Sequence, residues 1–207
     1  MARYISTTFG NIKGKHGTAV SSVRNGKVIL RVYNPPSNPK SPAQQTQRLK
    51  FGLVTSTLNL LRNLIYIGFG SKAGFFGAVS YALRNAVEGV YPNFNINFGK
   101  MLVSSGSLPQ SPEVTVSVVP NVGVEITWNT TTWNSGSPED LVYVGFLNPD
   151  MLMPYFDEAK STRKDGKLTV TLPEVWKGGT VHGWLFFVSP DGQLSSVSQY
   201  LGTIVPE

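Results

Sequence analysis

The pattern of hydrophobic and polar residues divides the chain into a mixed first part and a β-rich second part. Residues 17–33 predict a β-hairpin, because runs rich in β-branched residues flank Arg24-Asn25-Gly26-Lys27. Asn-Gly accepts the positive φ angles of a type I′ turn, which makes it the strongest short hairpin signal. Residues 33–42 then contain four prolines, which favour an extended segment.

Two amphipathic helices are predicted after the proline-rich segment. The first begins with Ser41 as N-cap, Pro42 in the first helical position and Gln44 completing a capping box, and apolar residues at helical spacing continue it to residue 68. The second covers about residues 73–88, with Gly89 as a C-terminal stop. A short strand or an extended arm is expected at residues 91–98, and a strand at residues 101–103.

From Pro112 onward, short β-rich runs alternate with turn signals such as Asp191-Gly192. This number and spacing of strands are typical of an immunoglobulin-like sandwich, in which Trp128 would be the core tryptophan. The expected strands cover residues 114–119, 122–128, 141–147, 167–172, 181–188 and 194–204.

Composition argues against most catalytic chemistry. The 207 residues include no Cys and two His, His16 and His182, which removes disulfides and Cys-ligated metals and leaves little imidazole chemistry. Asp150, Asp157 and Glu158 come nearest to paired carboxylates, and we interpret residues 148–160 as a charged loop. We expect no catalytic residue, no metal and no cofactor.

The net charge of +6 averages two unlike parts. Residues 1–110 carry thirteen Lys and Arg against the single acid Glu88, a net charge of +12, whereas residues 111–207 carry five basic and eleven acidic residues, a net charge of −6. Such asymmetry indicates an anionic partner for the basic part, or contact between opposite ends of neighbouring subunits.

The basic arm, residues 1–50, holds the candidate binding residues. It contains no acid, its glycines allow close backbone approach, and Tyr4, Phe9 and Tyr33 could stack on bases. The arm would bind either nucleic acid, through counterion release, or the acidic face of a neighbouring subunit. Its cations are Arg3, Lys13, Lys15, Arg24, Lys27, Arg31, Lys40, Arg48 and Lys50.

Several strings resemble a family of uncharacterised proteins of about this length from Bacteroides-type bacteria, a domain of unknown function. They include Gly10-Asn11-Ile12-Lys13-Gly14-Lys15-His16-Gly17, Asn38-Pro39-Lys40-Ser41-Pro42-Ala43-Gln44 and Ser198-Gln199-Tyr200-Leu201-Gly202. This resemblance covers nearly the whole chain and implies no established activity, catalytic residue or cofactor.

Two further resemblances cover parts of the chain. Residues 10–51 alone resemble the N-terminus of some phage structural proteins, which implies a particle-building role, although the Trp-rich continuation of those proteins is missing. Leu172-Pro173 and Gly178-Gly179-Thr180 before the strand 181–188 resemble the E–F corner of fibronectin type III modules. His182 stands where that family has its corner tyrosine.

Together these observations predict an α+β protein in two domains. Residues 1–110 form a basic region with a β-hairpin and two helices, and residues 111–207 form an acidic fibronectin-like antiparallel β-sandwich. We expect a non-enzymatic structural or assembly protein of phage-like character, with a homo-oligomer or another assembly partner. The alternatives are a nucleic-acid-binding protein and, as a minor one, an enzyme. Without a recognisable signal peptide or membrane span, a cytoplasmic location is expected.

Overall fold

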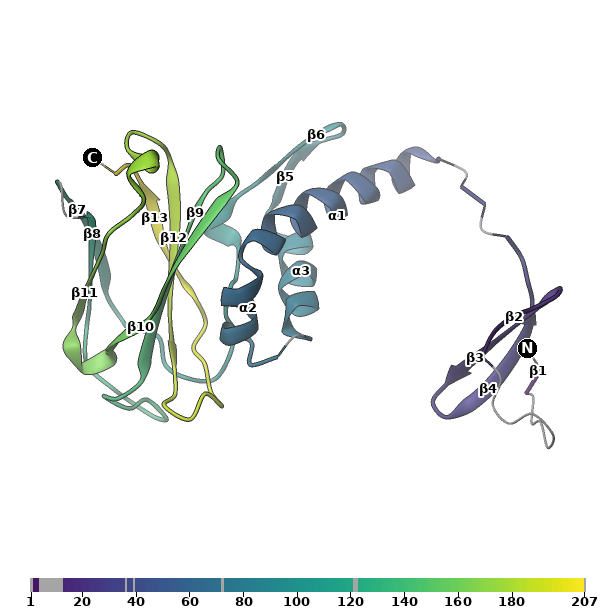
Figure 1. Ribbon diagram of the computed structural model, residues 1–207, viewed down its shortest axis with the longest axis horizontal. Coiled ribbons are helices and arrows are strands. Elements are labelled where there is room, and N and C mark those ends of the chain that lie inside the picture. The colour runs from purple at the N-terminus through teal and green to yellow at the C-terminus, as the bar shows by residue number, and fades with distance from the viewer. Residues whose placement is uncertain are drawn as a thin grey trace. The chain divides into compact units, whose positions relative to one another are not determined.

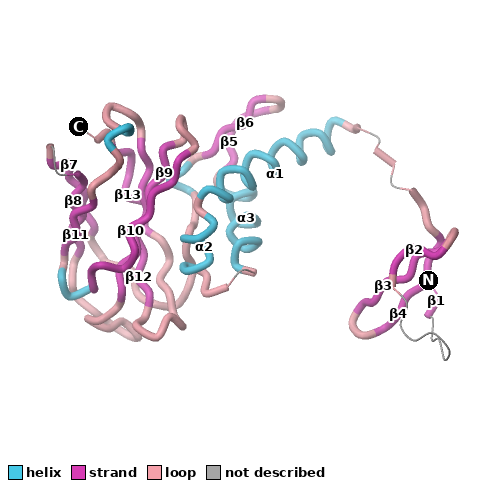
Figure 2. The backbone as a smooth tube through the Cα atoms, viewed as in Figure 1, coloured by secondary structure: helices cyan, strands magenta, loops and turns pink. Residues whose placement is uncertain are grey.

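The computed structural model describes residues 2–3, 13–35, 37–38, 40–71, 73–120 and 123–206 (Figures 1 and 2). The chain divides into two compact units, Met1–Ser41 and Pro42–Glu207. The predicted division at residue 110 differs from this one, and the physical reason is a core that the helices share with the C-terminal strands.

The N-terminal unit is a small antiparallel sheet. Its described strands are β1 (Ala2–Arg3), β2 (Gly14–His16), β3 (Ala19–Arg24) and β4 (Lys27–Val32), in the order β1-β4-β3-β2. The β3–β4 hairpin confirms the one predicted, because Asn25 and Gly26 form its turn with φ angles of 48° and 73°.

The described part of the C-terminal unit holds three α-helices, α1 (Pro42–Leu60), α2 (Arg62–Gly68) and α3 (Gly74–Asn85). Helix α1 begins at Pro42 as predicted, but the single helix expected to residue 68 is interrupted at Leu61, where φ is −94° and ψ is 13°. The interruption keeps Leu61 and Leu64 buried together. Within the described residues, no helix combines the length and apolar character that crossing a membrane requires.

A hairpin follows the helices. Strand β5 (Val87–Val90) pairs with β6 (Asn93–Ile96), and a short 3₁₀ helix, η1 (Phe98–Lys100), comes next. The strand expected at residues 101–103 is wrong, because this segment is irregular. Met101 and Val103 are buried without strand pairing, and the Val103 N–H instead donates to Ser198 Oγ at 3.1 Å.

Two antiparallel sheets make up the rest of the unit (Figure 1). One has the order β11-β8-β7, and the other has the order β10-β9-β12-β13. The strands are β7 (Val114–Val119), β8 (Gly123–Trp128), β9 (Leu141–Asn148), β10 (Met153–Thr162), β11 (Lys167–Val170), β12 (Val181–Val188) and β13 (Gln199–Ile204), with 3₁₀ helices η2 (Arg163–Asp165) and η3 (Glu174–Trp176). The α+β class with antiparallel sheets is therefore as predicted.

Strand β10 corrects the interpretation of residues 148–160 as a loop. Residues from Met153 to Asp157 pair antiparallel with β9, and the register shifts between Asp157 and Ser161. The shift explains the error, because an irregularity in the pairing breaks the two-residue alternation by which a strand is recognised.

Strand β12 is buried on both faces. Trp184 and Phe186 lie in a cluster with helix residues such as Leu64, whereas Leu185 and Phe187 lie in a second cluster. That second cluster joins the two sheets, since it contains residues of β8, β9, β11 and β12, with Trp128 among them. Because the helices pack on the C-terminal strands, a boundary at residue 110 would cut through one hydrophobic core.

A buried ion pair closes one end of the two sheets. Arg163 is 0% exposed, and its Nε donates to Asp140 Oδ2 at 3.1 Å while its Nη2 donates to the Pro109 carbonyl at 2.8 Å. The guanidinium lies 3.7 Å from the centre of the Phe187 ring, and the Arg163 carbonyl accepts from Trp128 Nε1 at 2.8 Å. Burial lowers the pKa of Arg163, and the Asp140 carboxylate opposes this shift.

Replacing Gly145 should disturb the contact between β9 and α2. A β-carbon at position 145 would overlap Leu64 Cδ2, and Leu64 is itself buried. We expect Gly145→Ala to lower the free energy of unfolding by roughly 1–3 kcal/mol, as overpacking does, measured by urea denaturation. The control is Gly52→Ala on α1, where a β-carbon meets nothing within 4 Å and should stabilise the helix. Unchanged stability of Gly145→Ala would contradict this packing.

Removing the buried guanidinium should be far more costly than removing an exposed charge next to it. We expect Arg163→Met to lower the free energy of unfolding by about 3–5 kcal/mol, because Asp140 is left buried without its partner. Lys164→Met is the matched control, since Lys164 pairs with Glu139 at 2.8 Å on the surface and its loss should cost far less. Similar losses in both variants would show that the buried pair has no special role.

Candidate functional site

The sheet of the N-terminal unit has two unlike faces. Side chains alternate between faces along a strand, and residues directly opposite each other on paired strands share a face. Lys15 is opposite Val20, Val20 is opposite Arg31, and Arg24 is opposite Lys27. These pairs define one surface, called the basic face from here on, which consists of Lys15, Arg24, Lys27 and Arg31 around Val20, Ser22 and Ile29.

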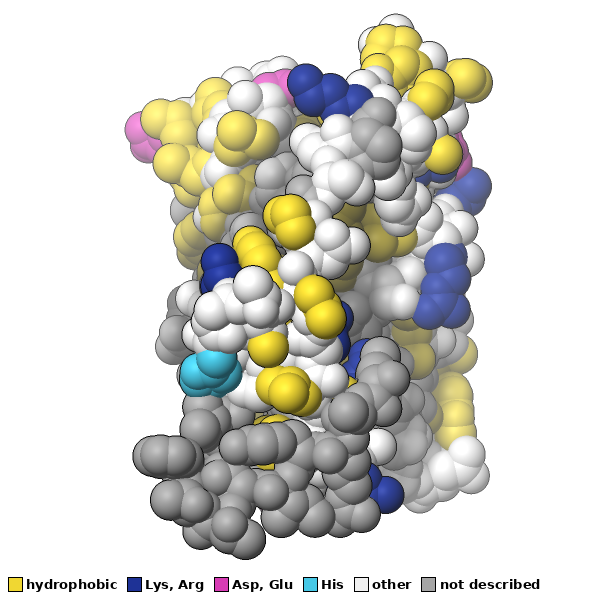
Figure 3. All heavy atoms as spheres, turned by 90° about the vertical axis from the view of Figure 1, so that its right-hand side faces the viewer, with side chains coloured by type: hydrophobic (Ala, Val, Ile, Leu, Met, Phe, Trp, Pro, Cys, Tyr) yellow, Lys and Arg dark blue, Asp and Glu magenta, His cyan; other side chains and the backbone are white. Residues whose placement is uncertain are grey.

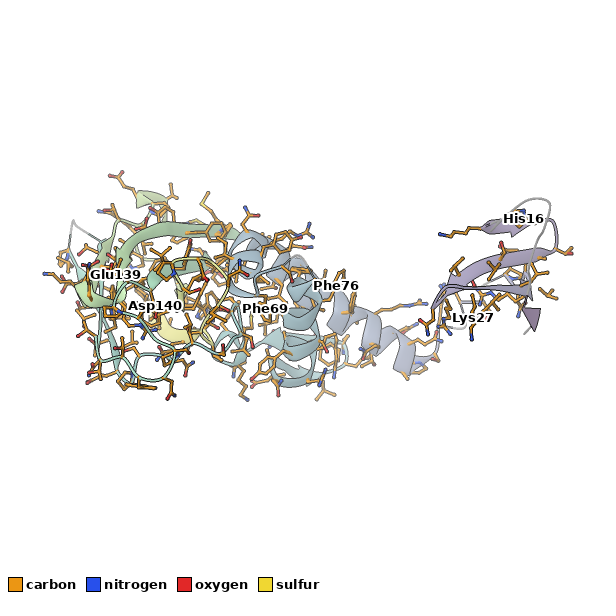
Figure 4. All side chains as sticks on the ribbon, turned by 90° about the horizontal axis from the view of Figure 1, so that it is seen from below. His16, Lys27, Phe69, Phe76, Glu139 and Asp140 are labelled. Atoms are coloured by element: carbon orange, nitrogen blue, oxygen red, sulfur yellow. The ribbon has the colours of Figure 1, made fainter. Side chains whose placement is uncertain are left out.

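The opposite face of the sheet is apolar. Val23, Val28 and Leu30 belong to it by the same alternation, and Val28 is 5% exposed. All four cations of the basic face are exposed, by contrast. Figure 4 shows Lys27 on β4 and His16 on β2 of this sheet. The alternation therefore places the four cations on one face and Val23, Val28 and Leu30 on the other.

A cavity of about 540 Å³ opens within this sheet. It is lined by Ser22, Val23, Arg24, Ile29 and Arg31, and most of these residues belong to the basic face. Two guanidinium groups therefore border a hollow whose middle is formed by a hydroxyl and an aliphatic side chain. Arginine presents a planar fork of N–H donors that matches the oxygens of phosphate or carboxylate.

One aromatic residue adjoins the basic face. Tyr33 follows β4, is 39% exposed, and its backbone N–H donates to the Thr18 carbonyl at 2.7 Å. The Lys15 ammonium lies 4.0 Å from the centre of the Tyr33 ring, in cation–π contact. Of the stacking residues named from sequence, Tyr33 is thus beside the cations, whereas Tyr4 and Phe9 lie outside the described residues.

Of the other predicted cations, Lys40, Arg48 and Lys50 lie outside the sheet. Lys13 precedes β2, and Lys40, with a φ angle of 48°, is exposed shortly before α1. Arg48 and Lys50 belong to the C-terminal unit, where the Lys50 ammonium lies 4.9 Å from the centre of the Phe94 ring. Arg3 is placed by its backbone alone, which pairs with that of Ile29.

Sequence reasoning treated the whole arm as one basic segment and missed Ser22 and Ile29 as cavity residues. The signal for them was present, because a two-residue turn at Asn25-Gly26 determines which residues of the hairpin face each other. In the view of Figure 3, Lys and Arg side chains spread over the visible face, whereas Asp and Glu side chains appear only near its upper part.

The residues considered for catalysis are structural in their contacts. His182 lies on β12, where its Nδ1 is 2.6 Å from the Tyr200 hydroxyl and its ring stacks on Phe98 at 4.2 Å between centres. Burial lowers the pKa of His182, and Asp150 opposes this shift. Asp157 is buried on β10.

Comparison with known proteins places the chain in a family. A model described as a family of unknown function (DUF6266) matches residues 11–202. The chain belongs to this family. The match confirms the expected membership of a domain of unknown function and covers both units, including the basic face. No curated protein matches the chain.

The pKa of His182 should make the stability of the protein depend on pH. Because burial lowers this pKa below the ordinary 6.5, the unfolded chain binds more protons than the folded one in the interval just below 6.5. The free energy of unfolding should therefore fall as the pH is lowered from about 7 towards about 5. His182→Gln should flatten this dependence, measured by denaturant unfolding at each pH. His16→Gln, at an exposed position, is the control, and equal pH dependence of all three proteins would contradict the expectation.

Proposed function

We propose that this chain is a non-enzymatic structural or assembly protein whose basic N-terminal unit contacts a partner subunit or a polyanion. One observation carries the proposal. Residues 1–41 contain seven Lys and Arg and no Asp or Glu, and they form a compact unit of their own. No carboxylate within this unit neutralises its charge, so a contact with an anionic surface would be favourable.

The small size of the unit supports an assembly role. Domains of about 40 residues bury too little apolar surface to be stable without disulfides, metals or association. Val28 is the one hydrophobic side chain that is buried among the described residues of this unit, and Val32 is 79% exposed. Contact with a partner would supply burial that the sheet lacks by itself.

We further propose that residues 111–207 form an immunoglobulin-like or fibronectin-like sandwich. The orders β11-β8-β7 and β10-β9-β12-β13 support this assignment, as does the buried cluster that contains residues of both sheets. Because a fold of this kind serves many functions, the functional proposal rests on the N-terminal unit and not on the sandwich. The phage-like character rests on the resemblance of residues 10–51.

Two alternatives come from other classes. A nucleic-acid-binding protein is favoured by the cations and the cavity of the basic face. An enzyme with an unrecognised site is the minor alternative. An enzyme would need a cavity lined by at least one of the residues Asp150, Asp157 and His182.

Light scattering of the full chain tests the proposal. We expect the measured molar mass to rise above the 22.5 kDa of one chain as the protein concentration increases, or the chain to bind heparin resin. Whichever of these effects is seen should weaken as salt is added. The variant Arg24→Gln/Lys27→Gln/Arg31→Gln should reduce whichever effect is seen. The control variant Lys40→Gln/Lys167→Gln/Lys177→Gln removes equal charge from exposed positions outside the sheet of the N-terminal unit and should reduce it less. A monomer at all concentrations that also fails to bind heparin would contradict the proposal.

A further inference from the structure

The cations of the basic face stand in two rows. Arg24 and Lys27 form one row across β3 and β4, and Arg31 with Lys15 forms another row across the sheet. Four residues along each strand separate the rows, which corresponds to about 13 Å. Between them lie Ser22 and Ile29, directly opposite each other. The two rows of cations therefore stand on either side of the Ser22–Ile29 pair.

Ser22 and Ile29 also line the cavity. Its volume of about 540 Å³ lies within the usual range for a small-molecule site, and Arg24 and Arg31 line it from the two different rows. A chain of linked phosphates that crosses the face would place negative charges beside both rows, with an uncharged unit over Ser22 and Ile29. Nucleic acid has this alternation of phosphate and uncharged sugar and base.

Tyr33 favours nucleic acid over an acidic protein surface. Its partly exposed ring lies at the Lys15 end of the basic face. An aromatic ring beside a positively charged groove is the usual combination for binding single strands, because every base can stack on it.

The width of the sheet favours a single strand over a duplex. A two-stranded ribbon enters the major groove of DNA, which is about 12 Å wide. In this sheet β1 and β2 flank the β3–β4 hairpin, and four strands span about 14 Å between their outer backbones. The sheet as a whole is therefore too wide for the groove, while its open face accepts a flexible strand.

We propose that the basic face binds single-stranded nucleic acid, with phosphates held by Arg24, Lys27, Arg31 and Lys15 and a base stacked near Tyr33. This inference rests on the proposed function and specifies its polyanion. Recognition by phosphate contacts and stacking is independent of base sequence and depends strongly on salt.

Fluorescence anisotropy of the full chain with a labelled oligothymidylate of about 20 nucleotides tests this site. The logarithm of the binding constant should fall linearly with the logarithm of the salt concentration, with a slope of about −0.7 for each phosphate contact. The double variant Arg24→Gln/Arg31→Gln should make this slope shallower by about 1.4. It should also reduce the affinity roughly 25-fold at about 0.1 M salt. The matched control, Lys40→Gln/Lys177→Gln, removes the same charge from exposed positions outside the sheet and should lose much less.

A further variant separates stacking from charge. Tyr33→Leu should weaken binding about five-fold or more and leave the salt slope unchanged, because the lost contact carries no charge. Thermal unfolding of each variant checks that it is folded. All the positions changed are exposed, so we expect melting temperatures equal to that of the wild type.

Several outcomes would overturn the site. These are no binding at about 50 mM salt, equal losses in the two double variants, or tighter binding to a duplex of the same length. The chain could instead fail to bind the oligonucleotide and still self-associate through the same arginines. In that case the partner is an acidic protein surface, and the proposed function stands without this inference. Loss of self-association, heparin binding and oligonucleotide binding together would contradict both.

Discussion

Both faces of β12 are buried, and the rest of the C-terminal unit depends on this arrangement. Trp184 and Phe186 pack against the helices, and Leu185 and Phe187 pack against the second sheet. A strand that is hydrophobic on both sides needs a layer on each side, because either face left open would expose large apolar side chains to water. The helices are therefore part of the same body as the sheets, and Gly145 allows α2 to approach the sheet closely.

The two units differ in whether their charged side chains are buried and paired or exposed. In the C-terminal unit, the buried guanidinium of Arg163 has a carboxylate, a carbonyl and an aromatic ring around it, and the carboxylate opposes the desolvation that lowers its pKa. In the N-terminal unit, the cations of the basic face remain exposed on a sheet whose own sequence contains no acid. The first arrangement stabilises a fold, and the second leaves electrostatic free energy available for a partner.

Local signals predicted the elements well where the chemistry of a few residues decides the backbone. Asn25-Gly26 formed the expected turn, and α1 began at Pro42. The errors occurred where packing decides. Helix α1 ends before Leu61 because the buried side chains before and after this residue must pack into the same core. Strand β10 was mistaken for a loop because its pairing with β9 is irregular between Asp157 and Ser161. The cations of the candidate site were all visible in the sequence, but not which of them share a surface.

The sequence by itself determined the turns, the starts of helices, the hydrophobic runs and the absence of acid from residues 1–41, since each of these depends on residues close together in the chain. Only the tertiary structure decided which faces meet. Strand pairing brought Lys15 onto the same face as Arg24, Lys27 and Arg31, whereas Lys40 lies outside the sheet. It also joined the helices to β12, because burial depends on contacts between residues distant in sequence.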